Sequence, residues 1–342
     1  MKPGLYVKLA PRVHGIRSRI VKPHVARELL EASDWKTFLR LLRETRIGKD
    51  VSENLTAIDV ERLILRSYIR DLRILEAYSP KYAKDIAGFY ISYEALKDLT
   101  FILKKILQGE KVGPEDIRLR GVHPLIDRIA GEIEYINTPS RVVELVKPPL
   151  NKIISRALKN YEDHGDLGLL ETEISYLALK EFAKRIELLN GYEKKKCLSV
   201  LCPRFNQAVI NLLVAAQIAG VKGERLEKIM DENISCGLDS ETINKIMFAD
   251  SVNQVLAILR QTSFREHVTS DPYTTLSNIR SYLRKTVWRK ANTVINGEPY
   301  NAGYIVAGAE LSRLEAEDLV YLVVTKYSGV SIESVEKGLV IL

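Results

Sequence analysis

Several residue types that carry chemistry are scarce in this chain. Its 342 residues include three cysteines, three methionines, two tryptophans and five histidines, and aromatic residues make up only 7%. The phosphate-binding pattern Gly-x-x-x-x-Gly-Lys-Ser/Thr, the dinucleotide-binding pattern Gly-x-Gly-x-x-Gly and the nucleophile pattern Gly-x-Ser-x-Gly are all absent. The sequence therefore favours a protein that is not an enzyme, with no catalytic site and no cofactor or metal of its own.

The candidate ligand groups are dispersed. The histidines stand singly, and the one beside carboxylates, His164, lies in "EDHGDLG", which is typical of a turn. Glu171 and Glu173 alternate, so on one helix they point about 200° apart and form no close carboxylate pair. We expect Glu173 at the start of a helix, where a negative charge suits the positive end of the helix dipole.

Cysteine usage and hydropathy bear on the compartment. The odd, small number of cysteines predicts buried free thiols in a reducing compartment, for Cys197, Cys202 and Cys236 alike. The first residues contain no apolar core of signal-peptide length. The longest apolar stretch, 208–221, has 14 residues and is too short to span a bilayer. We therefore expect a soluble protein on the cytoplasmic side, with no direct bilayer span.

The charge balance is only mildly basic. There are 51 lysines and arginines against 44 acidic residues, giving a net charge of +7, and no basic run of five residues occurs. The most basic segment is 276–295, in which Arg280, Arg284 and Arg289 are the candidate partner-binding residues. This segment is either a solvated helix face or a docking face for an acidic protein or RNA.

Three glycine-closed segments of one kind recur along the chain. They are 93–109, 204–220 and 313–329, and their glycines, Gly109, Gly220 and Gly329, are 111 and 109 residues apart. Apolar residues recur at steps of three and four in each segment, as in a helix that is buried on most sides. Each glycine stands where a helix needs a residue that tolerates a positive φ. Asp98-Leu99 and Asp318-Leu319 occupy one register before the first and third glycines.

Two further features keep the same period. Short helices are predicted after the caps Asp34, Thr138 and Ser251, with apolar residues four and seven positions later. Those residues are Phe38 and Leu41, Val142 and Leu145, and Val255 and Ile258. Long amphipathic helices follow over 59–78, 170–189 and 276–295, with Tyr68, Tyr176 and Tyr282 in their early turns.

Together these features predict an all-α fold of three tandem helical bundles. We expect boundaries near 116–122 and 222–238, which divides the chain into repeats 1–116, 117–227 and 228–342. Each repeat has the size of a helical domain rather than of a solenoid unit. Proline and glycine mark the links, and no period-two alternation persists over several segments.

In its repeat order and length, the chain resembles the C-type subunit of archaeal A-type ATP synthases, whose eukaryotic counterpart is the d-type subunit of the vacuolar (V-type) ATPase. The resemblance is strongest over 60–109, which begins "VERLILRSYIRDL", and next over 304–329, "YIVAGAELSRLEAEDLVYLVVTKYSG". The last helix departs from the family, which often has a Lys-Glu pair and an Asn-Leu-Arg-like run where this chain has Leu314-Glu315 and Asp318-Leu319.

The resemblance implies three pseudo-threefold-related bundles that form a funnel with a central cavity. It implies a peripheral, non-catalytic rotor protein that sits on the cytoplasmic face of the membrane proteolipid ring and receives the central shaft, which the D and F subunits form. Two other functions remain open from the residues alone. One is a helical scaffold that binds nucleic acid, and the other is an all-α enzyme with a site assembled from distant segments.

Overall fold

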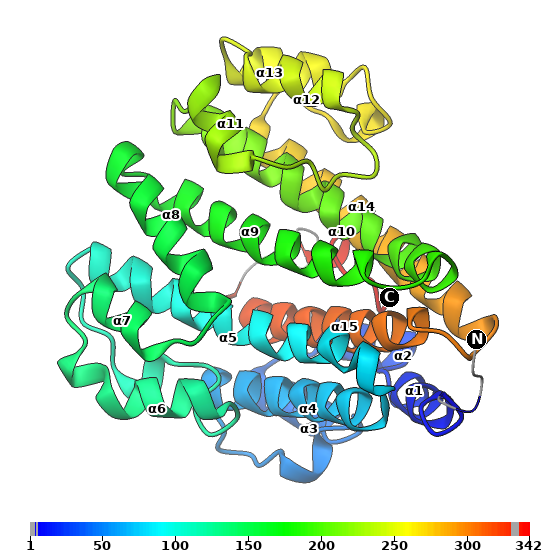
Figure 1. Cartoon of the computed structure of the whole chain (residues 1–342). Helices are drawn as coiled ribbons and strands as arrows, with labels where there is room; N and C mark the ends of the chain where they lie inside the picture. Colours follow the sequence, from blue (N-terminus) through cyan, green and yellow to red (C-terminus); the bar gives the residue numbers. More distant parts are fainter. Residues whose placement is uncertain (1–3, 5, 330–334) are drawn as a thin grey trace.

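The described chain is built from α-helices and short 3-10 turns. The computed structural model describes residue 4, residues 6–329 and residues 335–342, and no strand occurs among them (Figure 1). The α-helices are α1 (Ala10–Ser18), α2 (Pro23–Glu31), α3 (Trp35–Leu42), α4 (Ala57–Tyr78), α5 (Lys84–Leu107), α6 (Pro124–Glu132), α7 (Pro139–Leu145), α8 (Leu150–His164), α9 (Leu167–Glu187), α10 (Gly191–Ile218), α11 (Glu224–Met230), α12 (Ser240–Met247), α13 (Val252–Leu259), α14 (Pro272–Asn296) and α15 (Gly303–Ser328). The predicted all-α class is confirmed for these residues.

Three pairs of long consecutive helices form the framework. α4 packs on α5, α9 on α10, and α14 on α15. α15 lies among the others, because it also contacts α1, α4, α5 and α10, and Figure 1 shows it crossing the middle of the molecule. The shorter helices gather outside this framework, with α6 and α7 beside α5 and α11 to α13 around the far ends of α10 and α14 (Figure 1).

Local sequence signals explain where the long helices begin and end. α4 starts in a capping box between Thr56 and Asp59, and α9 and α14 start after Asp166 and Asp271, whose carboxylates accept first-turn N–H groups. After α5, α10 and α15, the three predicted glycines have positive φ values of 73°, 74° and 66°. The left-handed conformation predicted for these glycines is therefore confirmed.

The order of elements recurs along the chain. A short helix of seven or eight residues (α3, α7, α13) precedes a long helix of 21 to 25 residues, and a glycine-closed helix of 24 to 28 residues follows. α3 and α13 both lead into turns and a three-residue 3-10 helix, Gly48–Asp50 and Arg265–His267. α8 instead follows α7, across the cis Pro148–Pro149 bond. The pseudo-threefold arrangement and the repeat boundaries stay expectations.

The short helices bury a slightly different face from the predicted one. Asp34 and Ser251 accept N–H groups as predicted, whereas Thr138 is a cap without a side-chain hydrogen bond. The residues at position four, Phe38, Val142 and Val255, are fully buried. Those at position seven are only half-buried, and position eight is buried instead, within α3 and α13 and just after the end of α7. Positions four and eight lie closer together around a helix, so they share the core face.

The two repeated aspartates hold the chain that returns after the glycine. Asp98 of α5 accepts the N–H of Leu119 at 2.8 Å, and Asp318 of α15 accepts the N–H of Val340 at 2.6 Å. Both carboxylates are buried, and each also pairs with an arginine. The shared register that the sequence shows thus corresponds to a shared structural role, fixing a returning segment of chain against a long helix.

The corresponding contact of α10 is built differently. Val209 occupies the register of the two aspartates, and Asn206, one turn earlier, accepts the N–H of Cys236 at 2.8 Å. A disulfide joins Cys202 to Cys236 across 34 residues, with a Cα–Cα distance of 5.4 Å. The prediction of three free thiols is therefore wrong for two of them, because the folded chain, not sequence spacing, brings the sulfurs together. Only Cys197 is the predicted buried free thiol, and the argument for a reducing compartment loses its basis.

α10 is longer than the apolar stretch 208–221, which by itself is too short to span a bilayer. The helix has 28 residues, twice the length of the apolar stretch seen in the sequence, and it contains Pro203 in its interior. By length and composition it is the one described helix that could cross a membrane. However, 72% of its most apolar window is buried inside the fold, as in the core helix of a globular domain.

Candidate partner-binding cavity

Three cavities with shared lining residues lie side by side between the long helices, and we call them together the central hollow. Their volumes are about 450, 620 and 240 Å³, and all three are lined by Glu171 together with Ser175 of α9. α5, α9, α10, α14 and α15 all contribute side chains to this central hollow. The hollow therefore lies where helices from all three predicted repeats meet.

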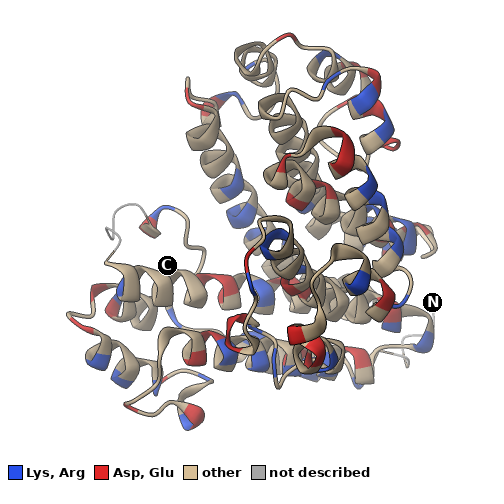
Figure 2. Ribbon diagram, turned by 90° about the vertical axis from the view of Figure 1, so that its left-hand side faces the viewer, with Lys and Arg blue, Asp and Glu red and all other residues tan. Residues whose placement is uncertain are grey.

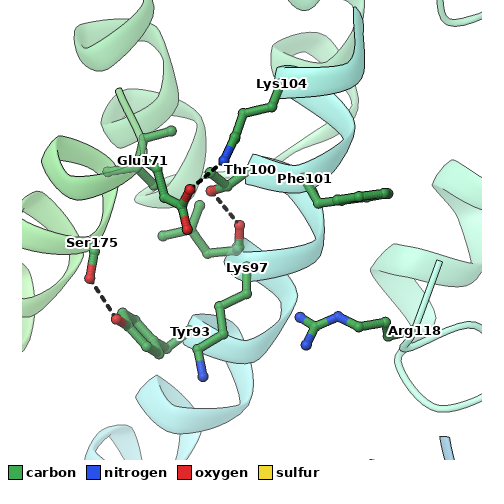
Figure 3. A pocket seen from close by; sticks show the side chains of 10 residues that line it. Tyr93, Lys97, Thr100, Phe101, Lys104, Arg118, Glu171 and Ser175 are labelled. Carbon is green, nitrogen blue, oxygen red and sulfur yellow. Dashed lines mark hydrogen bonds and ion pairs between the residues drawn. The ribbon is translucent and has the colours of Figure 1, made fainter. Parts of the chain in front are cut away.

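The wall between α5 and α9 is held by polar contacts. Tyr93 and Ser175 share a hydrogen bond of 2.7 Å, and Lys104 pairs with Glu171 (Figure 3). Lys97, one turn of α5 from Tyr93, extends its side chain beside the Tyr93 ring, with the amino nitrogen 5.3 Å from the ring centre (Figure 3). Because these contacts join the first and second long pairs directly, they fix the width of the hollow on this side.

Two of the three arginines predicted to bind a partner lie in the opposite wall of the hollow. Arg280 and Arg284 of α14 both line the hollow. Arg289 does not, since nine residues are two and a half helical turns and place it on the other side of α14 from Arg280. Arg289 therefore does not share the face of α14 that Arg280 and Arg284 present to the hollow.

Arg284 and Arg280 differ in exposure and in ion pairing, and therefore in their availability to a partner. The side chain of Arg284 is only 4% exposed, and it pairs with Glu317 and Asp318 of α15. It is part of the wall, and its charge is already balanced. Arg280 is exposed and its guanidinium lies 5.4 Å from the ring centre of Tyr321, with no ion pair in the part of the chain that the structure describes.

Charged groups line the smallest of the three cavities. Five are basic, and the two acidic ones are Glu171 and Glu317, the basic set being Lys97, Arg204, Arg280, Arg284 and Arg313. Burial would raise the pKa of Glu317, but Arg313, Arg284, Lys97 and Arg280 together hold it well below its ordinary value. Glu317 is therefore ionised at neutral pH. Four of the five basic groups pair with carboxylates, and Arg280 is the one without an ion pair among the described residues.

Beneath the hollow, a buried ion cluster joins three long helices. Glu310 of α15 is fully buried and accepts hydrogen bonds from Arg204 of α10, Tyr90 of α5 and Arg313, at 2.7 to 2.9 Å. Burial would raise the pKa of Glu310, yet Arg313 and Arg204 keep it below its ordinary value. The sequence did contain a signal for this cluster, because charged residues 310, 313 and 317 recur at steps of three and four within an otherwise apolar helix.

Glu173 differs from its expected role at the start of a helix. α9 begins six residues earlier, at Leu167, so Glu173 lies in the second turn and is fully buried. Asn160 donates to its Oε1 at 2.5 Å, while Oε2 has no hydrogen-bond partner. Burial raises the pKa of Glu173 to about 7, against the opposing effects of Asn160 and Arg156.

Glu173 should make the protein less stable as the pH rises. Its pKa is about 7 in the folded chain against the ordinary 4.5, so the folded state holds the proton more tightly, and the free energy of unfolding falls between these pH values. We expect Glu173→Gln to remove this fall, which amounts to about 3 kcal/mol at most. Urea unfolding at pH 5, 6, 7 and 8 measures it. Glu171→Gln, in the same helix but 55% exposed, is the matched control and should keep the wild-type profile. Identical profiles for wild type and Glu173→Gln would contradict the prediction.

Other chemistry-bearing residues have local structural roles. His123 and His164 each accept a backbone N–H at the start of α6 or in the turn before α9, and burial lowers the pKa of both. Gly165 adopts φ 68° after α8, which confirms the turn predicted at "EDHGDLG". Within the described residues, no group of three or more His, Cys, Asp and Glu side chains is placed to hold a metal ion.

The fold and the site together describe an all-α protein in which pairs of long helices surround a polar cavity. A family model described as "ATP synthase (C/AC39) subunit" matches residues 9–338, nearly the whole chain. The chain belongs to this family, and the resemblance seen in the sequence is confirmed. A search of the curated proteins found no match.

Membership assigns a coarse function. The family consists of subunits of V/A-type ATPases, peripheral accessory subunits of the stalk that are generally not catalytic, and it implies association with other rotary ATPase subunits. No finding supports the alternative of a nucleic-acid-binding scaffold. In the view of Figure 2, basic and acidic residues are interspersed along the helices instead of forming one continuous basic face.

Proposed function

We propose that this chain is a rotor component of an A/V-type rotary ATPase, a socket between the central shaft and the membrane ring. The D and F subunits of the shaft would enter the central hollow, and the outer surface would rest on the proteolipid ring at the cytoplasmic face of the membrane. In this role the chain catalyses nothing itself. It transmits rotation for ion-driven ATP synthesis or ATP-driven ion pumping.

The central hollow is the observation that carries this proposal. Its lining comes from five long helices, so a partner bound there contacts all three long pairs at once. Arg280 lines the hollow without an ion pair among the described residues, so its charge suits an acidic group at the tip of the shaft. Charge complementarity of this kind fixes orientation and speeds association more than it adds affinity.

The packing below the hollow supports the mechanical part of the proposal. Torque is transmitted only if the socket resists deformation, and close-packed helices deform little. α15 runs through the centre and contacts α1, α4, α5, α10 and α14. The hydrogen bonds of Glu310 tie α15 to α5 and α10, so the long pairs are joined by directional contacts as well as by apolar packing.

Reconstitution of the rotary complex tests the proposal. Without this chain, we expect the soluble head to keep its ATP hydrolysis, since the nucleotide sites would lie on other subunits, while ion pumping into vesicles is lost. Adding back the purified chain should restore pumping. Full pumping in its absence would refute the rotor role.

A pair of variants in the same assay tests the docking residue. Arg280→Glu reverses a charge in the hollow, and Arg289→Glu makes the same change on the other side of α14. A single exposed pair is worth roughly 0–1 kcal/mol, so we expect Arg280→Glu to weaken assembly modestly and Arg289→Glu to leave it unchanged. Equal effects of the two variants would remove Arg280 from the docking site without affecting the rotor role.

A further inference from the structure

A second cavity, which shares no lining residue with the central hollow, lies beside α4. Its volume is about 660 Å³, within the range of about 300–1,000 Å³ that small-molecule sites occupy. It is formed by the link from α1 to α2, the turns after α3, and the outer face of α4. We call it the basic pocket, because its charged lining residues are Arg19, Lys22, Arg46, Lys49 and Arg70 against the single acidic Glu44.

Only part of this positive charge is balanced by the protein. Arg19 and Arg46 both pair with the buried Asp71, and Arg46 also pairs with Glu315 at 2.8 Å. The remaining three, Lys22, Lys49 and Arg70, are exposed and form no ion pair among the described residues. The pocket thus has two arginines in ion pairs, the buried Arg46 and the exposed Arg19. It also has three exposed cations without an ion pair, beside the single carboxylate Glu44.

Two further groups in the pocket lack a partner. The side chain of Arg46 is 3% exposed, and its Nε is buried without a hydrogen-bond acceptor. α2, nine residues long, begins at the pocket with Pro23, which has no N–H group, and Val25 of its first turn is in the lining. Its cap residue Lys22 makes no side-chain capping bond, so the donors on offer are the N–H groups of His24 and Val25. First-turn N–H groups have no partner within their own helix, so they favour an anion.

We propose that the basic pocket binds a ligand that carries adjacent phosphate groups. The exposed arginine and lysine side chains would neutralise the phosphates, and the arginine fork favours planar recognition of their oxygens. The start of α2 would supply backbone N–H donors. A volume of about 660 Å³ is larger than a single phosphate ion fills, so the pocket suits a ligand with two or more phosphate groups. This site is independent of the proposed rotor role and does not rest on it.

Calorimetric titration of the full chain with inorganic tripolyphosphate at low salt tests the site. We expect saturable binding that weakens as salt is added. Lys49→Gln combined with Arg70→Gln should weaken it by about tenfold, because both charges are exposed and lie outside the buried ion pairs. Lys36→Gln combined with Arg40→Gln removes the same charge from exposed positions of α3 outside the pocket, and should leave binding unchanged.

Vesicle sedimentation distinguishes the two sources of such phosphates. If phosphatidylcholine vesicles bind the chain only when they contain phosphatidic acid, and tripolyphosphate competes, the ligand is a lipid headgroup. If tripolyphosphate binds and the vesicles do not, the ligand is a soluble phosphate compound. The proposal is overturned if neither probe binds saturably, or if the pocket variant and the α3 variant lose affinity equally.

Discussion

Replacing Glu310 by glutamine should lower the free energy of unfolding by about 3–5 kcal/mol, the usual cost of removing one partner from a buried ion pair. Glu310 is 0% exposed, and the loss of its charge leaves Arg204, itself buried, without a carboxylate. Arg313 keeps one carboxylate partner in this variant, because it also pairs with Glu317 at 2.6 Å. Urea unfolding at neutral pH gives the measurement.

Glu144→Gln is the surface control. The side chain of Glu144 is 63% exposed and pairs with Arg141 three residues earlier, so this change should cost at most about 1 kcal/mol. Exchanging both Glu310 and Arg204 for methionine should recover part of the loss, since it removes both charges of the pair. If Glu310→Gln costs no more than Glu144→Gln, the cluster does not stabilise the joint between α5, α10 and α15.

Opening the Cys202–Cys236 disulfide should lower the free energy of unfolding by about 3–4 kcal/mol. The bond closes a loop of 34 residues, and constraining the unfolded chain over that length accounts for a value of this size. α11 lies within the loop, so the bond anchors it to the framework helix α10. Unfolding with and without dithiothreitol measures the effect.

Two controls isolate this bond. The protein unfolded without reductant should show one free thiol, that of Cys197, and three after reduction. The double variant Cys202→Ser with Cys236→Ser should have the lower stability from the outset, and dithiothreitol should not change it further. Three free thiols in the unreduced protein, or a variant as stable as the wild type, would contradict the prediction.

The site was partly predictable from the sequence. Arg280 was recognised as a candidate because it belongs to the most basic helix, and it does line the central hollow. Lys97, Glu171 and Glu317 were missed as site residues, because each is an ordinary charge on an amphipathic helix. Helical spacing alone could have separated Arg289 from Arg280, whereas the burial of Arg284 depends on its contact with Glu317 of α15, 33 residues further along the chain.

The sequence by itself determined the elements of this protein and where they end. Caps such as Asp34 and Ser251, and glycines such as Gly109 and Gly220, act on residues within one or two helical turns, so the chain's local chemistry is enough to place them. The recurrence of these signals, together with the register of Asp98 and Asp318, also carried enough information to indicate the family.

Only the tertiary structure decided which polar groups are buried, paired or free. The Cys202–Cys236 bond, the pairing of Glu310 with Arg204 and the raised pKa of Glu173 all depend on neighbours that sequence spacing does not reveal. Glu310 and Arg204 are 106 residues apart, and only the packing of α10 on α15 brings their charges into a common buried environment. Burial and charge pairing are properties of that environment, and the long helices create it only when they pack together.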